Sequence, residues 1–296
     1  MKEEQFFIHF ADAKIAIFCY SPNNFTPEKL SQKVINPLLM IHGFRGTHHG
    51  LLDIVREIFL IDEKAGIFRE IFIPDLPNFG ISQALSQKND ADSFAKLTEE
   101  IINIISQKTG STKIDLFGHS FGTLVVARTA KKSPEKIAKL VLASPISRKP
   151  LSHLNAKFAN LYFVLAKILP NKQREKWLRA KFAIKIMNHS AVINPAKKPE
   201  ILAKHLAHFS DFQSVDAMLE TYFSAGNDDI LSFANEIAVP TLVISGDSDN
   251  IAPEKEAIEL SRKIPNGKFI SIAGVGHILH HETPTEVSIA MVEFLK

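Results

Sequence analysis

Short apolar segments alternate with longer amphipathic segments along most of this chain. The apolar segments, each five to seven residues long, are residues 6–10, 14–20, 37–41, 70–74, 113–117, 137–143, 240–245 and 268–272. The amphipathic segments carry apolar residues at helical spacing and are residues 49–61, 93–108, 123–130, 254–263 and 283–295. The first two apolar segments are joined by Ala11-Asp12-Ala13 and predict a hairpin. The whole pattern predicts an α/β fold, in which helices flank both faces of a mostly parallel sheet.

Residues 147–235 interrupt this alternation. They keep helical periodicity without a convincing strand, and prolines at positions 150, 170, 195 and 199 divide them into about four helices. The interruption follows the sixth predicted strand. We therefore expect a helical cap (lid) over residues 147–235, inserted into an α/β core made of residues 1–146 and 236–296.

Charge is distributed unevenly between cap and core. From Arg148 to Ser210 there are 13 lysines and arginines and two acidic residues, whereas the whole chain has a net charge of only +3. The small total charge does not suggest a nucleic-acid partner. The basic cap has two open interpretations: a solvated face, or a surface that weakly contacts an anionic membrane or an anionic substrate.

Composition sets the remaining limits. With 296 residues, 45% of them hydrophobic, the chain can form one large domain or a domain with an insertion. The one cysteine, Cys19, excludes an intramolecular disulfide framework and fits a reducing compartment. The acidic amino-terminal residues lead into no long apolar run, and no uncharged run reaches the roughly 18–20 residues of a membrane span. We expect a cytoplasmic protein, and composition indicates no particular oligomeric state.

The five residues Gly118-His119-Ser120-Phe121-Gly122 read G-x-S-x-G. They lie where the predicted strand 113–117 runs directly into the predicted helix 123–130. A serine at such a turn is held in a strained backbone conformation with its hydroxyl exposed. A β-carbon at either glycine would collide with the neighbouring strand or helix. This setting predicts that Ser120 is a nucleophile.

A serine hydroxyl is a poor nucleophile at neutral pH, so it needs a base, and the base needs an orienting carboxylate. His277 lies in a glycine-containing loop just after the predicted strand 268–272. Asp247 and Asp249 lie in the loop after the preceding strand, 240–245. The order serine, acid, histidine is known from one class of catalytic triads. The residues alone do not decide between the two aspartates.

Four further segments resemble motifs of the α/β-hydrolase superfamily, and specifically of its members with a helical cap. Residues 39–46 are similar to the H-G-x-x-G oxyanion segment. Residues 73–82 are similar to the P-D-L-P-G-x-G-x-S loop, with Asn78 where glycine is usual. Residues 246–249 are similar to the G-x-x-D acid segment, and residues 274–277 to the G-x-G-H segment. The resemblance covers nearly the whole chain outside the predicted cap.

The resemblance implies a role for five residues. Ser120 is expected to be the nucleophile, His277 the general base and Asp249 the orienting acid. The backbone N–H groups of Phe44 and Phe121 are expected to form the oxyanion hole, which stabilises the negative oxygen of the tetrahedral intermediate.

Other polar residues near the motifs have structural interpretations. His42 is expected to bond to the backbone, and His119 to pack beside the turn. His48 and His49 are expected to be solvated loop residues, and Asp75 to tie its loop to the backbone.

The implied chemistry needs no metal and no cofactor, and the histidines at 277, 280 and 281 with Glu282 have no recognised zinc spacing. Capped relatives that open epoxides or displace halide have an aspartate at the position of Ser120, so the serine implies acyl transfer. We expect a serine hydrolase that cleaves a small-molecule carboxylic ester through an acyl-enzyme. A C–C bond hydrolase or thioesterase on the same triad, and a slow-turnover ligand-binding or signalling protein, are the open alternatives.

Overall fold

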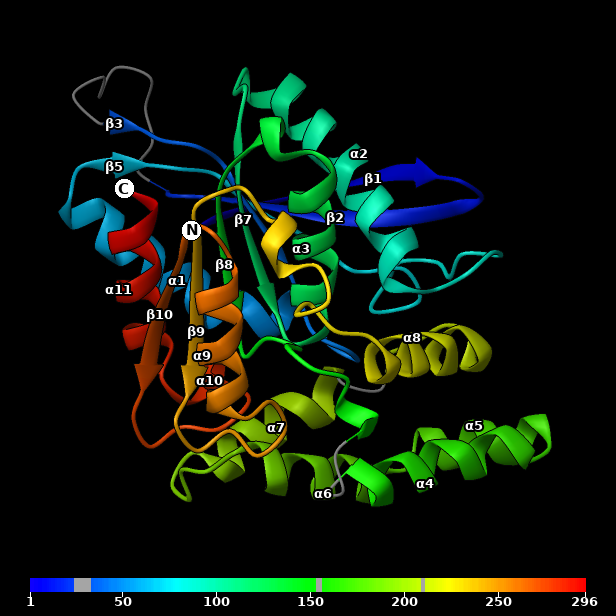
Figure 1. Cartoon of the computed structure of the whole chain (residues 1–296). Helices are drawn as coiled ribbons and strands as arrows, with labels where there is room; N and C mark the ends of the chain where they lie inside the picture. Colours follow the sequence, from blue (N-terminus) through cyan, green and yellow to red (C-terminus); the bar gives the residue numbers. More distant parts are fainter. Residues whose placement is uncertain (24–32, 153–155, 209–210) are drawn as a thin grey trace.

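The computed structural model describes residues 1–23, 33–152, 156–208 and 211–296. Eight strands form one sheet in the order β1-β2-β6-β4-β7-β8-β9-β10 (Figure 1). The six strands from β6 to β10 in this order run parallel, and the β1–β2 hairpin joins β6 antiparallel. The strands are β1 (Lys2–Phe10), β2 (Ala13–Ser21), β4 (Leu38–Ile41), β6 (Ile71–Pro74), β7 (Ile114–His119), β8 (Ile137–Ala143), β9 (Thr241–Gly246) and β10 (Gly267–Ile272). The predicted mostly parallel sheet and the hairpin are confirmed.

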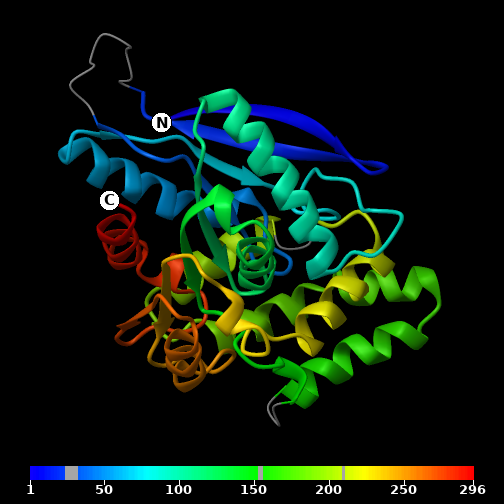
Figure 2. The same cartoon turned by 45° about the horizontal axis from the view of Figure 1, so that its top comes forward.

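Helices cover both faces of this sheet (Figure 2). Because successive side chains of a strand point to opposite faces, a strand covered on both sides is apolar throughout. In β4, Leu39 and Ile41 pack with helices α2, α3 and α9, whereas Leu38 and Met40 pack with α1 and α11. The core helices are α1 (Leu52–Lys64), α2 (Ala91–Thr109), α3 (Phe121–Lys132), α9 (Glu254–Lys263), α10 (Leu279–Glu282) and α11 (Pro284–Leu295).

The described part of the cap contains five α-helices, which follow β8, the sixth strand of the central sheet in chain order. They are α4 (Ala156–Ile168), α5 (Asn171–Leu178), α6 (Lys181–Ala191), α7 (Lys198–His208) and α8 (Val215–Asn227). The helices lie beyond the carboxyl ends of the sheet strands (Figure 1). The proline pattern predicted about four helices, in part because the sequence between α5 and α6 and the sequence between α7 and α8 contain no proline. The first of these breaks occurs at Ala180, whose backbone is extended (φ −68°, ψ 122°).

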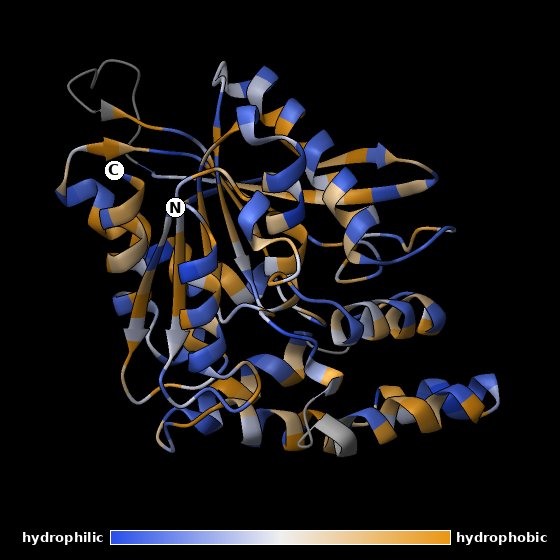
Figure 3. Ribbon diagram, in the orientation of Figure 1, coloured by the Kyte–Doolittle hydropathy of each residue, from blue (hydrophilic) through white to orange (hydrophobic). Residues whose placement is uncertain are grey.

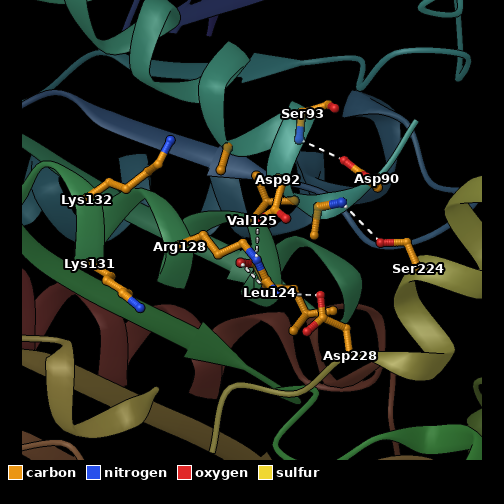
Figure 4. A network of polar contacts seen from close by, with 12 residues as sticks. Asp90, Asp92, Ser93, Leu124, Val125, Arg128, Lys131, Lys132, Ser224 and Asp228 are labelled. Carbon is orange, nitrogen blue, oxygen red and sulfur yellow. Dashed lines mark hydrogen bonds and ion pairs between the residues drawn. The ribbon is translucent and has the colours of Figure 1, made fainter. Parts of the chain in front are cut away.

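One side of the cap is held to the core by a network around Arg128 of α3 (Figure 4). The guanidinium pairs with Asp92 in the first turn of α2, at 2.8 Å, and with Asp228 directly after α8. At the same corner, the Ser224 hydroxyl of α8 accepts a hydrogen bond from the Ala91 backbone N–H at 3.1 Å. The last helix of the cap is therefore bonded to two helices of the core.

The distribution of hydropathy follows the layers (Figure 3). The strands of the central sheet are mostly hydrophobic, while the helices that cover them mix hydrophobic and hydrophilic residues. Among the described residues, no helix combines the length and the apolar character needed to cross a membrane.

A buried carboxyl group in β7 makes stability depend on pH. Asp115 is wholly buried, and desolvation raises its pKa from 3.8 to about 7, against the opposing charges of Arg69 and Lys139. The folded state thus favours the protonated form, so the contribution of this group to stability is complete below about pH 4 and is lost as the pH rises through 7.

We expect Asp115→Asn to remove this loss of stability, which is at most about 4 kcal/mol for about three pKa units. In urea unfolding, the variant should gain stability over the wild type at pH 8 but much less at pH 5. An equal difference at both pH values would contradict the prediction.

Candidate active site

Ser120 connects the end of β7 to the start of α3 and has a backbone conformation that few non-glycine residues adopt. Its dihedral angles are φ 51° and ψ −118°. A β-carbon at Gly118 would lie 2.6 Å from the carbonyl oxygen of Gly122, and one at Gly122 would lie 2.4 Å from the carbonyl oxygen of Ile41. Both positions require glycine for the strand and the helix to approach so closely. The strained serine turn is present as the sequence predicted.

Three side chains from the carboxyl ends of different strands meet at this turn. Ser120 follows β7, Asp249 lies in the loop after β9, and His277 lies in the loop after β10. The His277 Nε2 atom is 2.8 Å from the Ser120 hydroxyl oxygen. The His277 Nδ1 atom is 2.9 Å from a carboxylate oxygen of Asp249. The structure therefore brings the three predicted residues into one hydrogen-bonded row.

The charge state of Asp249 determines which nitrogen of His277 carries the proton. Burial disfavours the charged form of Asp249, but His277 and the backbone N–H groups of Ile251 and Ala252 outweigh it, and the pKa of Asp249 lies below its usual range. The two N–H groups donate to Oδ1 at 2.8 Å each. An ionised carboxylate can only accept, so Nδ1 of a neutral His277 carries the hydrogen and Nε2 presents a lone pair to Ser120.

Asp247, the other candidate acid, has a different role. Its Oδ1 atom accepts hydrogen bonds from the Ser248 hydroxyl at 2.8 Å and from the Gly274 backbone N–H at 2.9 Å. Gly274 has a positive φ of 72°. Asp247 thus holds the turn that precedes His277, and Asp249 is the acid beside the imidazole.

The two residues predicted to supply the oxyanion hole belong to segments that pack against Ser120. Phe121 is the first residue of α3, so its N–H has no acceptor within the helix. A β-carbon at Gly43 would lie 3.2 Å from Cβ of Ser120, so the chain passes directly beside the serine just before Phe44. Among the backbone hydrogen bonds that turns, loops and helix caps make within the described residues, none is donated by the N–H of Phe44 or of Phe121.

The Phe44 side chain joins the core to the cap, a contact that the sequence pattern does not indicate. Its ring centroid lies 5.9 Å from that of Phe79 in the core, and 6.0 and 5.8 Å from those of Phe163 and Tyr222 in the cap. Phe163 of α4 and Tyr222 of α8 stack on each other at 3.6 Å. An aromatic cluster from both core and cap therefore surrounds Phe44, which follows the glycine that packs against Ser120.

Glu282 supports the loop of His277 and was not assigned a role from the sequence. It is buried, and its Oε1 atom accepts the Gly276 backbone N–H at 2.8 Å. Its Oε2 atom accepts the backbone N–H groups of Ile193 and Asn194, in the cap, at 2.9 and 2.8 Å. The carboxylate of Glu282 therefore binds the loop of His277 to the cap.

Within the described residues, no group of three or more histidine, cysteine or acidic side chains is arranged to hold a metal ion.

The backbone of His277 has two further partners. Its N–H donates to the carbonyl oxygen of Ala191, the last residue of α6, at 3.1 Å. Its carbonyl oxygen accepts a hydrogen bond from Nε2 of His119 at 3.0 Å. Burial lowers the pKa of His119 to about 3, so its ring is neutral. His119, expected only to pack, therefore also holds the loop of His277.

Of three further histidines with an expected role, His42 and His49 meet the expectation and His48 does not. His42 bonds to the backbone as expected: Nε2 accepts the Leu76 N–H at 2.9 Å, and Nδ1 donates to the carbonyl of the next residue at 2.8 Å. The expectation that His48 is solvated was wrong, because its side chain is buried and its Nδ1 lies 2.8 Å from Oδ1 of Asp75. Asp75 also accepts the His48 backbone N–H at 2.8 Å, so it ties its loop as predicted. His49 is exposed.

A family model described as the alpha/beta hydrolase fold matches residues 36–284. The chain belongs to the α/β-hydrolase family. One relative is the uncharacterised hydrolase YugF of Bacillus subtilis, which is 23% identical over 88% of this chain and 89% of that protein. Another is protein phosphatase methylesterase 1 of Candida albicans, 22% identical over 90% of this chain and 70% of that protein.

Solved structures agree on the fold. The malate-bound thermophilic esterase from Thermogutta terrifontis has a TM-score of 0.74 and 21% identity, covering 100% of this chain and 98% of that one. An esterase from Exiguobacterium antarcticum has a TM-score of 0.74 and 15% identity, covering 98% of each chain. As a member of this family, the protein is an α/β-fold hydrolase.

This α/β hydrolase departs from the family pattern at Asn78, whose side chain forms hydrogen bonds to the cap. Asn78 has φ 77°, in the left-handed region that glycine adopts freely and asparagine tolerates. Its Oδ1 atom accepts the N–H groups of Ser214 and Gln213 at 2.6 and 3.1 Å, and its Nδ2 donates to the Ser214 carbonyl at 3.0 Å. Ser214 caps the start of α8. The side chain thus adds a link to the cap that glycine cannot make.

Replacing Asn78 by glycine should loosen the cap without straining the loop. The variant keeps the left-handed backbone but loses three hydrogen bonds, so we expect a destabilisation of about 1–3 kcal/mol. Hydrogen exchange should accelerate mainly at the amide of Ser214 and remain unchanged in the central sheet. The Gln213 N–H also donates to the backbone carbonyl of residue 78 at 3.0 Å, a bond that glycine keeps, so its exchange should accelerate less. Asn78→Asp is the matched control, because it keeps an acceptor for both amides and should exchange more slowly there than the glycine variant. Unchanged exchange at these amides in Asn78→Gly would refute the link.

Proposed function

We propose that this α/β hydrolase is a serine esterase, which cleaves carboxylic esters through an acyl-enzyme on Ser120. The observation that carries the proposal is the row of hydrogen bonds from Ser120 through His277 to Asp249, at 2.8 and 2.9 Å. A nucleophile beside a base that is itself oriented by a carboxylate is the arrangement that acyl transfer requires. Relatives and structural neighbours with esterase in their names support the same choice.

In the first half of the reaction, the Ser120 hydroxyl oxygen attacks the carbonyl carbon of the ester. His277 Nε2 takes the hydroxyl proton as the new C–O bond forms, and the carbonyl oxygen becomes an oxyanion. The N–H groups of Phe44 and Phe121 stabilise this oxyanion, and one such donor contributes a factor of about 100–1,000 in rate. The positive end of the α3 dipole adds to the stabilisation, because Phe121 begins that helix.

In the second half, the tetrahedral intermediate collapses and the alcohol leaves. His277 returns its proton to the leaving oxygen, so the alcohol departs neutral and Ser120 retains the acyl group. A water molecule then repeats the sequence: His277 takes its proton, the hydroxide oxygen attacks the acyl carbon, and Ser120 leaves as a hydroxyl. Asp249 stays ionised throughout and stabilises the imidazolium form of His277 in both halves.

The surroundings of the serine favour an apolar acyl group. The rings of Phe44, Phe163 and Tyr222 gather next to the oxyanion segment, and such a cluster stabilises hydrocarbon better than a charged group. We therefore expect esters of short to medium apolar acids to be better substrates than esters of dicarboxylic acids.

The test combines covalent trapping with a substrate panel. A fluorophosphonate should add to Ser120, identified by mass spectrometry of the peptide, and an ester substrate should slow the labelling. The panel should contain p-nitrophenyl esters of increasing chain length, matched thioesters, and β-diketones for C–C cleavage. The highest kcat/KM is expected for an ester. A higher value for a diketone or thioester would replace the esterase by that activity, and labelling without turnover would indicate a slow ligand-binding protein.

A further inference from the structure

Two cap helices carry large apolar side chains that are exposed in the described structure. In α4 these residues are 37–75% exposed and follow the spacing i, i+3, i+4, i+7, so they form one stripe: Leu161, Val164, Leu165 and Ile168. In α6, Phe182 is 47% exposed and Ile186 is 64% exposed, one turn apart. The two helices hold six of the large apolar side chains that are exposed in the described structure.

Part of the cap's positive charge that has no ion-pair partner in the described structure lies on the same part of the chain. Helices α5 and α6 carry four exposed lysines: Lys172, Lys176, Lys181 and Lys185. In the residues that the structure describes, none of the four takes part in an ion pair. Other basic residues of the cap segment do, since Arg148 pairs with Glu259, Arg174 with Asp216, and Lys204 with Asp53. Those pairs neutralise other basic residues of the cap segment, whereas the four lysines have no such partner among the described residues.

Lysines and apolar side chains share one face of α6. At 100° per residue, Lys181, Phe182, Lys185 and Ile186 fall within one exposed face of the helix, while Ala183 and Ile184 are buried against the protein. Helices α4 and α5 lie at the same end of the molecule and extend past the sheet (Figure 1, Figure 2). We call the α4 stripe together with the exposed residues of α5 and α6 the cap surface.

We propose that the cap surface docks on an anionic lipid bilayer. Helices that bind at a lipid interface combine exposed apolar side chains with lysines, and their binding depends on both. A second copy of the chain fits poorly, because a symmetric contact would place the four lysines of one copy against the same four of the other. A protein partner is also disfavoured, since protein interfaces are depleted in lysine. Docking does not depend on the proposed esterase activity.

Trp177 reports on this surface directly. It is the only tryptophan of the chain, it belongs to α5, and its ring lies 5.2 Å from that of Tyr162 and 5.8 Å from that of Phe182. If the neighbouring apolar side chains enter lipid, the fluorescence of Trp177 should shift to shorter wavelength. Binding through any other face of the protein should leave it unchanged.

The experiment uses the full chain with Ser120→Ala, so that no lipid is hydrolysed. Sedimentation and Trp177 fluorescence are measured with phosphatidylcholine vesicles, with and without phosphatidylserine. We expect binding and a spectral shift with the anionic vesicles at low salt, loss of both at high salt, and little binding to neutral vesicles. Changing the four lysines to glutamine should weaken binding about 600-fold, since each contributes about fivefold near an anionic surface.

Two sets of variants separate this surface from overall charge. A control set of four exposed lysines outside the cap, also changed to glutamine, alters the net charge equally and should affect binding little: Lys64, Lys96, Lys113 and Lys255. Ile168→Ser with Ile186→Ser should reduce both binding and the Trp177 shift. The proposal is overturned if both lysine sets weaken binding equally, or if anionic vesicles do not bind at low salt. It is also overturned if soluble polyglutamate competes fully while Trp177 fluorescence stays constant, because an acidic protein then fits better.

Discussion

Changing Ser120 to alanine should lower kcat for ester hydrolysis by about a millionfold, to the rate left by substrate binding and the oxyanion donors alone. The Ser120 hydroxyl oxygen is the atom that His277 Nε2 faces at 2.8 Å, and alanine leaves that base without a nucleophile. Steady-state kinetics on the best p-nitrophenyl ester measures the loss. The substrate should still bind, so KM should change far less than kcat.

Ser144 supplies a matched control for this substitution. It follows β8, is buried, and has a positive φ of 46°, close to the 51° of Ser120. Ser144→Ala makes the same chemical change at a similarly strained position, and it should leave kcat within a few-fold of the wild type. If Ser120→Ala retained activity within tenfold of the wild type, or if Ser144→Ala lost as much, Ser120 would not be the nucleophile.

Changing Asp249 to asparagine should lower kcat by about ten thousandfold. The asparagine amide can donate a hydrogen bond to Nδ1 of His277, which favours the tautomer whose Nε2 already carries a hydrogen. That Nε2 can no longer accept the proton of Ser120. The variant also loses the negative charge that stabilises the imidazolium. The measurement is kcat with the same ester, together with circular dichroism to show that the fold is intact.

Asp247→Asn is the comparison that makes the second result decisive. Asp247 bonds to Ser248 and Gly274 and has no bond to the imidazole, so its replacement should alter the loop and reduce kcat by less than about tenfold. A larger loss of kcat from Asp247→Asn than from Asp249→Asn would show that Asp249 is not the acid of the triad.

The central strands were predictable because burial on both faces makes them apolar throughout, as in β4. The elements that the sequence analysis missed are too short to show a hydrophobic pattern. Strands β3 (Lys33–Val34) and β5 (Ile67–Phe68) form a separate two-stranded sheet of two residues each, too short to show a period. The break between α5 and α6 contains neither proline nor glycine.

The candidate triad could be located because each member lies in a short local motif at a strand end. Its supports could not, because they depend on contacts between distant residues. His119 binds the carbonyl of a residue 158 positions away, and Asn78 binds Ser214, 136 positions away. The sequence shows that Asn78 replaces a glycine, but only the folded chain shows what its amide reaches. In the sequence, Glu282 is likewise an ordinary acidic residue near a helix, and only the structure shows that it is buried.

The links between the cap and the loop of His277 use the main chain on the cap side. Ala191 contributes its carbonyl oxygen, and Ile193 and Asn194 contribute their N–H groups. Side chains at these three positions can therefore diverge in evolution, or be randomised in a library, without removing the bonds that align the imidazole. The same bonds couple this part of the cap mechanically to the loop of His277. Any displacement of the cap at these positions would therefore be transmitted to the imidazole.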